Sequence, residues 1–224
     1  MAQIGEANIL KCSAMSGDVV FCVAAQCLAR KGEAMILIQT TGVGVLDLLL
    51  NAPTTKAREG KLKPAELMEQ ATRRARRDAD GDTILDADQV MECLLAGARF
   101  GGFKQDKKSV ATYLEAIMRV EQHPTLENNK GQRDYDRIDS RPGRVPPRTG
   151  AMVDILRPQF DSGWKFHARI WLMNDLVKTD TIRQIVACAG QYCGLGSYRP
   201  RHGLFVVEQF DVQVVDDKAS TLHA

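Results

Sequence analysis

"AGQYCGLGSYRPRHGLFVVEQF" spans Ala189–Phe210 and joins the end of a helix, a glycine-punctuated loop and the beginning of a strand. The helical pattern over residues 179–193 stops at Gly194, and glycine is the residue that most readily takes the left-handed conformation at a helix end. Residues 204–215 then change to alternating apolar and polar side chains, as in a half-buried strand. The C-terminal part of the chain is therefore predicted to be helix, loop and strand.

Two further strands are predicted before this helix. "AMVDILRP", residues 151–158, and "GWKFHARIWLM", residues 163–173, are rich in strand-forming residues, and the short connection between them favours a hairpin. Alternate residues of the second stretch share a face, and one face is apolar. The opposite face carries Lys165, His167, Arg169 and Trp171. The residues that we expect to be buried are Trp164, Phe166, Ile170, Ile185 and Val212.

The first strand is predicted at "MILIQTT", residues 35–41, a β-rich run that we expect Gly42 and Gly44 to end. A helical insertion is expected over about residues 56–122, because three stretches there show helical spacing of apolar side chains. These stretches are residues 63–79, 86–102 and 107–122. Residues 125–148 are rich in Asn, Gly, Arg, Asp and Pro, which predicts a long exposed basic arm rather than a core element.

The expected order is strand, helical segment, strand, strand, helix, strand. This order predicts an α+β fold of the ferredoxin-like or RRM-like βαββαβ type, with a helical insertion after the first strand and a long basic arm. We expect residues 35–215 to form one domain and residues 216–224 to be a tail. RNA-recognition modules use the same fold and bind on the open face of the sheet, so the outward side chains of residues 163–173 become candidate contacts.

Residues 1–34 differ from the rest of the chain, since they hold three of the six cysteines and show no clean period. They end in "ARKGEA", whose purine-rich codons would suit a bacterial ribosome-binding site before Met35. One hypothesis is therefore an upstream extension with Met35 as the true start. The other is a genuine N-terminal element, with "DVVFCVAAQCLARK" as a short strand or helix. The intact mass of the natively expressed protein would decide between them.

Composition excludes several classes of protein. Hydrophobic residues make up 44% and charged residues 26%, as in ordinary soluble domains, and no apolar run reaches the roughly 18 residues of a membrane span. The cysteines form no CxxC pair and only four histidines are present, so we expect neither a metal nor another cofactor. Since no secretory signal is evident, a cytoplasmic location with reduced thiols is expected. The net charge of +2 indicates no particular partner, so a charged ligand would need a local basic surface.

Such a surface is predicted at the loop after Gly194. The three glycines of the loop allow close backbone approach, its arginines are candidate phosphate donors, and its aromatic rings are candidates for stacking on bases. The loop candidates are Gly194, Gly196, Tyr198, Arg199, Arg201, His202 and Gly203, and Arg144 and Arg148 of the arm join them. Two plainer readings stay open: the glycines only end a helix, and the outward residues of the strand are only solvated.

Four stretches carry a resemblance to a known family. They are "MILIQTTGVGVLDLLLN", "TILDADQVMECLLAGARF" with the following "KKSV", the arm ending "RVPPRTGAMVDILRPQF", and the motif over Ala189–Phe210. In these the sequence resembles phage and prophage proteins related to the repeat-associated (RAMP) RNA-binding superfamily, which includes the backbone subunits of CRISPR surveillance complexes. The resemblance implies a RAMP-like domain over residues 35–215, encoded by a phage or prophage in a bacterial host, whose glycine-rich loop lies against RNA.

Three function classes follow. The first is non-enzymatic binding of RNA or single-stranded DNA, in a homo-oligomer or a larger nucleoprotein complex that assembles along the strand. The second is a RAMP-type endoribonuclease, which would need a general base such as His167 or His202. The third is an interaction protein that mimics or inhibits a CRISPR-type complex. No membrane partner is expected.

Overall fold

The structure, a computed structural model, describes residues 35–51, 64–122, 124–145 and 151–215. Its helices are α2 (Pro64–Thr72), α3 (Ala87–Phe100), α4 (Val110–Ile117) and α5 (Thr179–Cys188), which continues into the π-helical turn η1 (Ala189–Cys193). The longer strands are β1 (Met35–Gly44), β9 (Arg137–Val145), β10 (Ala151–Phe160), β11 (Lys165–Leu172) and β12 (Phe205–Val215). The short strands are β2 (Leu48–Leu49), β3 (Arg76–Arg77), β4 (Thr83–Ile84), β5 (Lys104–Gln105), β6 (Lys108–Ser109), β7 (Met118–Val120) and β8 (Thr125–Glu127). The expectations for residues 1–34, 52–63 and 216–224 fall outside the described residues.

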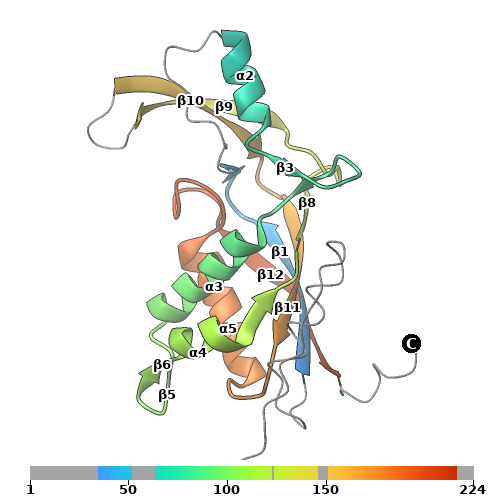
Figure 1. Cartoon of the computed structure of the whole chain (residues 1–224), viewed down its shortest axis with the longest axis vertical. Coiled ribbons are helices and arrows are strands. Elements are labelled where there is room, and N and C mark those ends of the chain that lie inside the picture. Colours follow the sequence, from blue (N-terminus) through green and yellow to red (C-terminus); the bar gives the residue numbers. More distant parts are fainter. Residues whose placement is uncertain (1–34, 52–63, 123, 146–150, 216–224) are drawn as a thin grey trace, which may run out of the picture.

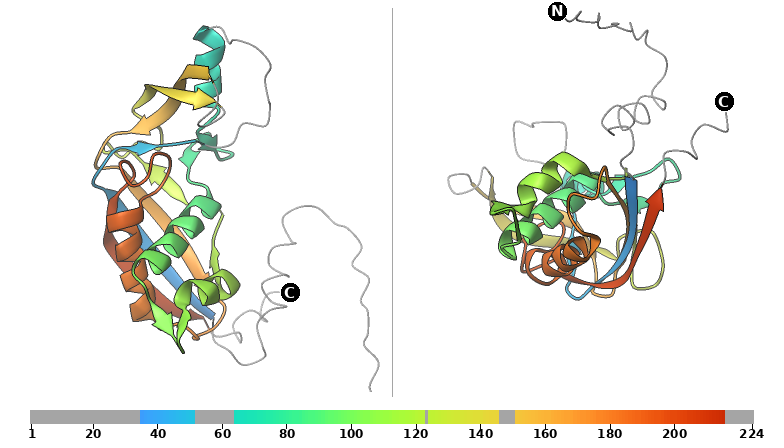
Figure 2. Two further views of the ribbon diagram at one scale, coloured as in Figure 1. Left: turned by 90° about the vertical axis from the view of Figure 1, so that its left-hand side faces the viewer. Right: turned by 90° about the horizontal axis from the view of Figure 1, so that it is seen from below.

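The main sheet is built around β1, which pairs antiparallel with β11 on one side and with β12 on the other. The strand order is β12-β1-β11-β8-β4-β3, and β7 also pairs with β11. Helices α3, α4 and α5 lie together on one face of this sheet, as Figures 1 and 2 show. The succession of β1, helices, β7 and β8, β11, α5 and β12 is the ferredoxin-like pattern, so the predicted fold class is confirmed.

The second strand of this pattern is not the one that the sequence predicts. Strands β7 and β8 take that place, since Met118 pairs with Leu172 of β11 and Glu127 pairs with Lys165. The predicted hairpin between residues 151–158 and 163–173 is wrong, because β10 pairs with β9 and β2 in a separate three-stranded sheet. Met118 continues the helical spacing of α4, and Pro124 separates β7 from β8, so neither piece is long enough to show a strand period.

The segment predicted as an exposed arm is also different. Within residues 125–148, β8 and β9 are strands, and β9 pairs with β10 from Arg137↔Gln159 to Val145↔Ala151. An antiparallel ladder joins backbone groups, which every residue but proline can supply in full, so a polar composition does not prevent it. Figure 1 shows the β9–β10 hairpin projecting from one end of the molecule, with α2 beside it.

The core lies between the helices and the inner face of the main sheet. Four of the five expected core residues are confirmed, because Trp164, Phe166, Ile170 and Ile185 are each at most 2% exposed. The expectation for Val212 is wrong, since its side chain is 39% exposed. Strand β12 lies at the edge of the sheet and has a paired neighbour on one side only, which leaves its outer half uncovered.

Strand β1 runs further than predicted, through the two glycines that were expected to end it. A Cβ atom at Gly42 would lie 2.1 Å from the Phe166 ring, and one at Gly44 would lie 2.0 Å from the indole nitrogen of Trp164. These glycines therefore make room for two large rings of the neighbouring chain segment. Their role is close packing within the sheet, and not termination of the strand.

Helix α3 packs closely against η1 at Gly97, and this contact gives a first testable expectation. A Cβ at this position would lie 2.8 Å from the backbone nitrogen and Cα of Ala189. Gly97→Ala should gain up to about 1 kcal/mol from helix propensity but lose about 1–3 kcal/mol from overpacking. We expect a net loss of stability in urea denaturation, and a more stable variant would contradict the close contact.

Candidate nucleic-acid interface

The outer face of β11 carries the four side chains that the strand period predicts. Phe166, Ala168, Ile170 and Leu172 are buried toward the helices, whereas His167 and Arg169 are exposed and Lys165 and Trp171 are half-buried on the opposite face. The separation of one basic and aromatic face from one core face is therefore observed.

Most of the charge on this face is already paired. Lys165 Nζ lies 3.1 Å from a carboxylate oxygen of Glu208, and Arg169 Nη1 lies 3.0 Å from a carboxylate oxygen of Glu121. The other oxygen of Glu121 accepts a hydrogen bond from the Trp171 indole at 3.2 Å. Exposed ion pairs of this kind contribute little stability, so phosphates could displace the two carboxylates. With the carboxylates in place, the face is less basic than its sequence suggests.

The glycine-rich loop is held against β2 and the end of β1 by backbone hydrogen bonds. Ser197 N donates to Leu49 O at 2.8 Å, and Gly203 N donates to Asp47 O at 2.8 Å. Gly196 and Gly203 both have positive φ, and a Cβ at Gly203 would lie 1.9 Å from Leu195 O. The loop thus requires glycine for its own shape and its contacts, as well as for any approach of a ligand.

The side chains of the loop lie in different surroundings. Arg199 and Arg201 are exposed, and Arg199 lies 3.7 Å from Glu92 of α3. One side of the Tyr198 ring is occupied, because the Arg157 guanidinium lies 4.5 Å from the ring centroid. His202 Nε2 lies 2.6 Å from Nη1 of Arg141.

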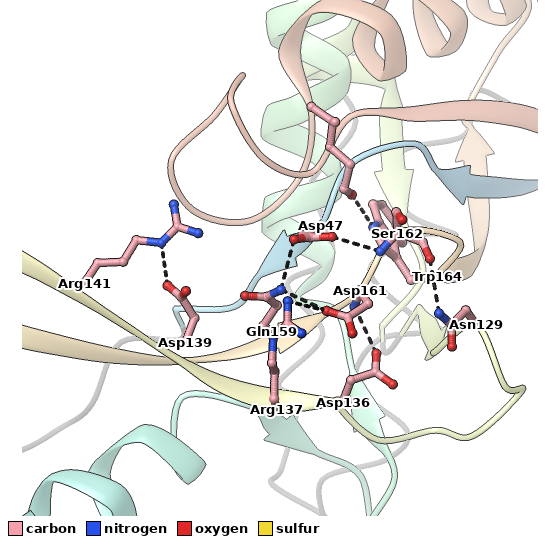
Figure 3. Close-up of polar contacts among 11 residues, drawn as sticks. Asp47, Asn129, Asp136, Arg137, Asp139, Arg141, Gln159, Asp161, Ser162 and Trp164 are labelled. Carbon is pink, nitrogen blue, oxygen red and sulfur yellow. Dashed lines mark hydrogen bonds and ion pairs between the residues drawn. The ribbon is translucent and has the colours of Figure 1, made fainter.

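A polar network fixes the base of the β9–β10 hairpin beside this loop (Figure 3). The Asp47 carboxylate accepts hydrogen bonds from Gln159 Nε2 and Ser162 N, both at 3.0 Å. The Arg137–Asp161 ion pair at 2.9 Å links β9 to the end of β10. Asp47 follows β1, and its backbone carbonyl accepts the hydrogen bond from Gly203 of the loop. The network therefore connects the hairpin, the loop and the main sheet.

The structure does not bring all the predicted residues together. Trp171 lies about 20 Å along β11 from Lys165, at about 3.3 Å per residue, and Lys165 is at the end nearer the loop. Arg199 contacts the helical side of the sheet, whereas the four β11 side chains point away from the helices. Arg144 is in β9 and its side chain is not described, and Arg148 lies outside the described residues.

The residue that sequence reasoning missed is Arg157 of β10. It is buried, although it comes from a strand that the sequence placed in the wrong sheet. The fold also brings Arg74 and Arg141 close to Tyr198 of the loop. In the sequence, Arg157 is a lone arginine between Leu156 and Pro158. This local pattern does not identify a site.

The buried thiol of Cys93 gives a pH-dependent expectation. Burial, with a smaller effect from the neighbouring thiol of Cys193, raises the pKa of Cys93 to about 12 from an ordinary 9.0. The native thiol therefore stays protonated above pH 9, while the unfolded thiol ionises. Its contribution to stability is complete below about pH 9 and is lost between there and about pH 12, by up to about 1.4 kcal/mol per pH unit.

We expect the native protein to lose stability faster than Cys93→Ala between pH 8 and 10, as measured by urea denaturation. A difference in free energy of unfolding that stays constant over this range would contradict the buried thiol. Burial also raises the pKa of Cys188 and Cys193, which disfavours reactive thiolates in this helical layer.

Other features of the described residues can be placed separately. A groove of about 490 Å³ lies between the start of α3 and β7, and Arg76, Met91 and Arg119 are among its lining residues. No group of three or more His, Cys, Asp or Glu side chains within the described ranges could hold a metal ion. None of the helices described is long and apolar enough to cross a bilayer.

Comparison with known proteins supports the fold. No protein-family model matches the chain, and no curated protein matches it. Among solved structures, the chain is similar to one in the cryo-EM structure of the type III-B Cmr-beta bound to cognate target RNA, with 9% identity and a TM-score of 0.55. The match covers 88% of this chain and 65% of that one. It shows a shared fold.

Proposed function

We propose that this protein binds single-stranded RNA without cleaving it, and that the glycine-rich loop is the principal contact. The observation that carries the proposal is the loop itself, which is pinned by backbone hydrogen bonds to Asp47 and Leu49 and presents Arg199 and Arg201 to solvent. Ordered loops with exposed cations suit phosphate binding. The structural neighbour is described as bound to target RNA, which favours RNA over single-stranded DNA as the ligand.

The outer face of β11 is a secondary contact in this proposal. To bind phosphates, Lys165 and Arg169 must give up their ion pairs with Glu208 and Glu121. Arg201 of the loop, in contrast, is in none of the ion pairs found among the described residues. We therefore expect loop substitutions to weaken binding more than substitutions on the strand face.

Cleavage of RNA is the second candidate, and the histidines do not favour it. His167 Nδ1 lies 2.9 Å from the Thr41 hydroxyl, and His202 contacts Arg141. Among the hydrogen bonds and ion pairs of the described ranges, neither imidazole contacts a carboxylate that would orient it as a general base.

Gel-shift and cleavage assays on labelled single strands test the proposal directly. Retarded, intact RNA is the expected result, and equal retardation of DNA would widen the ligand class to single strands in general. Cleaved RNA would overturn the non-enzymatic proposal and favour the endoribonuclease. If the protein neither binds nor cleaves the labelled strands, the result would favour a protein that interacts with a CRISPR-type complex.

We further propose that copies of the chain assemble along the strand. The β9–β10 hairpin projects from one end of the molecule, where it can reach a neighbouring subunit (Figure 1). Light scattering should show a particle mass that grows with RNA length in steps of one subunit, 24.8 kDa. A strict monomer both with and without RNA would contradict assembly and leave the binding proposal intact.

A further inference from the structure

Four side chains lie around the ring of Tyr198, and we call these five residues, which come from four chain segments, the Tyr198 cluster. They are Arg74 after α2, Arg141 of β9, Arg157 of β10, and Tyr198 and His202 of the loop. The Arg157 and Arg141 guanidinium carbons lie 4.5 Å and 5.9 Å from the Tyr198 ring centroid, and the His202 ring centroid lies 6.4 Å from it.

The Tyr198 cluster holds more positive charge than it neutralises. Among the ion pairs of the described residues, Asp139 is the one carboxylate that contacts it, through Arg141 at 2.6 Å. Arg157 is only 9% exposed, and its Nε and Nη1 atoms are buried without a hydrogen-bond partner. Buried cations are normally paired, because desolvation of an unpaired charge is costly.

His202 supplies a third unsatisfied donor. The Arg141 guanidinium can only donate, so His202 Nε2 must accept the hydrogen bond between them at 2.6 Å. The neutral imidazole then carries its proton on Nδ1, which is buried and has no partner. All three unsatisfied atoms of the Tyr198 cluster are therefore N–H donors, so what the cluster lacks is an acceptor.

Arg74 adds to the positive potential. Its Nη1 donates to Leu156 O at 2.9 Å, which holds the side chain beside β10. Burial, and next the charge of Arg157, lower the pKa of Arg74. The smaller of these two effects shows that Arg74 lies close enough to Arg157 for their charges to repel each other, and an anion would relieve that repulsion.

We propose that the Tyr198 cluster is a binding site for one phosphate group, which accepts hydrogen bonds from Arg157 and His202. The proposal rests on the proposed function, in which the phosphate belongs to the backbone of a bound RNA strand. Tyr198 seats the Arg157 guanidinium on its ring face, and one side of that ring is therefore not available to a base. Solvent reaches the cluster at Tyr198 and Arg141, whose side chains are 41% and 36% exposed.

The first test uses inorganic phosphate and thermal unfolding, at constant ionic strength against chloride. Phosphate at tenfold above its Kd should raise the Tm of the native protein by about 3–6 °C and should leave the Tm of Arg157→Met unchanged. Arg183→Met is the matched control, because Arg183 also lies over an aromatic ring, 4.6 Å from the Phe210 centroid, but outside the cluster. Equal phosphate stabilisation of the native protein and Arg157→Met would overturn the site.

The second test measures binding of labelled single-stranded RNA over a series of salt concentrations. Arg157→Met should bind roughly tenfold more weakly than the native protein, with a salt slope smaller by about 0.7 for one lost phosphate contact. His202→Phe removes the buried Nδ1 donor of the loop, and this variant serves if Arg157→Met does not fold, as judged by circular dichroism. Native affinity and slope in folded Arg157→Met or His202→Phe would overturn the site while RNA binding stands. Phosphate stabilisation without RNA binding by the native protein would instead support the site and overturn the proposed function.

Discussion

Replacing Trp164 with alanine should lower the free energy of unfolding by about 3–5 kcal/mol. The side chain is fully buried and packs against Phe166 and Phe205, with ring centroids 6.1 Å and 6.4 Å away. Its indole also donates to Leu46 O at 2.8 Å, and this carbonyl would lose its partner in the variant. Urea denaturation monitored by circular dichroism measures the effect.

Trp171→Ala is the matched control for this expectation. The chain has two tryptophans, and Trp171 lies half-buried on the outer face of the same strand, where its indole contacts Glu121. Its loss should cost much less than the loss of Trp164. Equal destabilisation by the two substitutions would contradict the assignment of inner and outer faces on β11.

Replacing both Arg199 and Arg201 with alanine should give the largest loss of RNA affinity among loop variants. If each arginine contacts one phosphate, the slope of log affinity against log salt should flatten by roughly 0.7 per contact, and binding should weaken for all sequences alike. The stability of the protein should change little, because both side chains are exposed. Fluorescence anisotropy with labelled RNA over a series of salt concentrations measures both quantities.

A second double variant, Arg73→Ala with Arg99→Ala, controls for the loss of two positive charges. Arg73 and Arg99 are exposed residues of the helical region and pair with Glu69 and Glu115. This double variant should keep the slope of log affinity against log salt near its native value. An equal reduction of slope in both double variants would mean that net charge, and not the loop, determines binding.

The sequence by itself determined the helices and strands whose apolar side chains recur with a regular period. The alternation along residues 163–173 assigned the buried and outer faces of β11, because neighbouring side chains of a strand point to opposite sides. Apolar spacing located α3, α4 and α5, and Gly194 marked the end of the last helical turn. Glycines and arginines in one loop were enough to single out the candidate site.

The tertiary structure alone decided which strands are neighbours. Strand pairing depends on backbone hydrogen bonds between distant segments, and a local period reports burial but not the partner. For this reason β10 was assigned to the wrong sheet, and β9 was predicted as a loop. The same limit applies to charge, since nothing local indicates that Glu121 and Glu208 neutralise the β11 face or that Arg157 lies buried against Tyr198. These pairings join residues far apart in the chain, and only folding places them within contact distance.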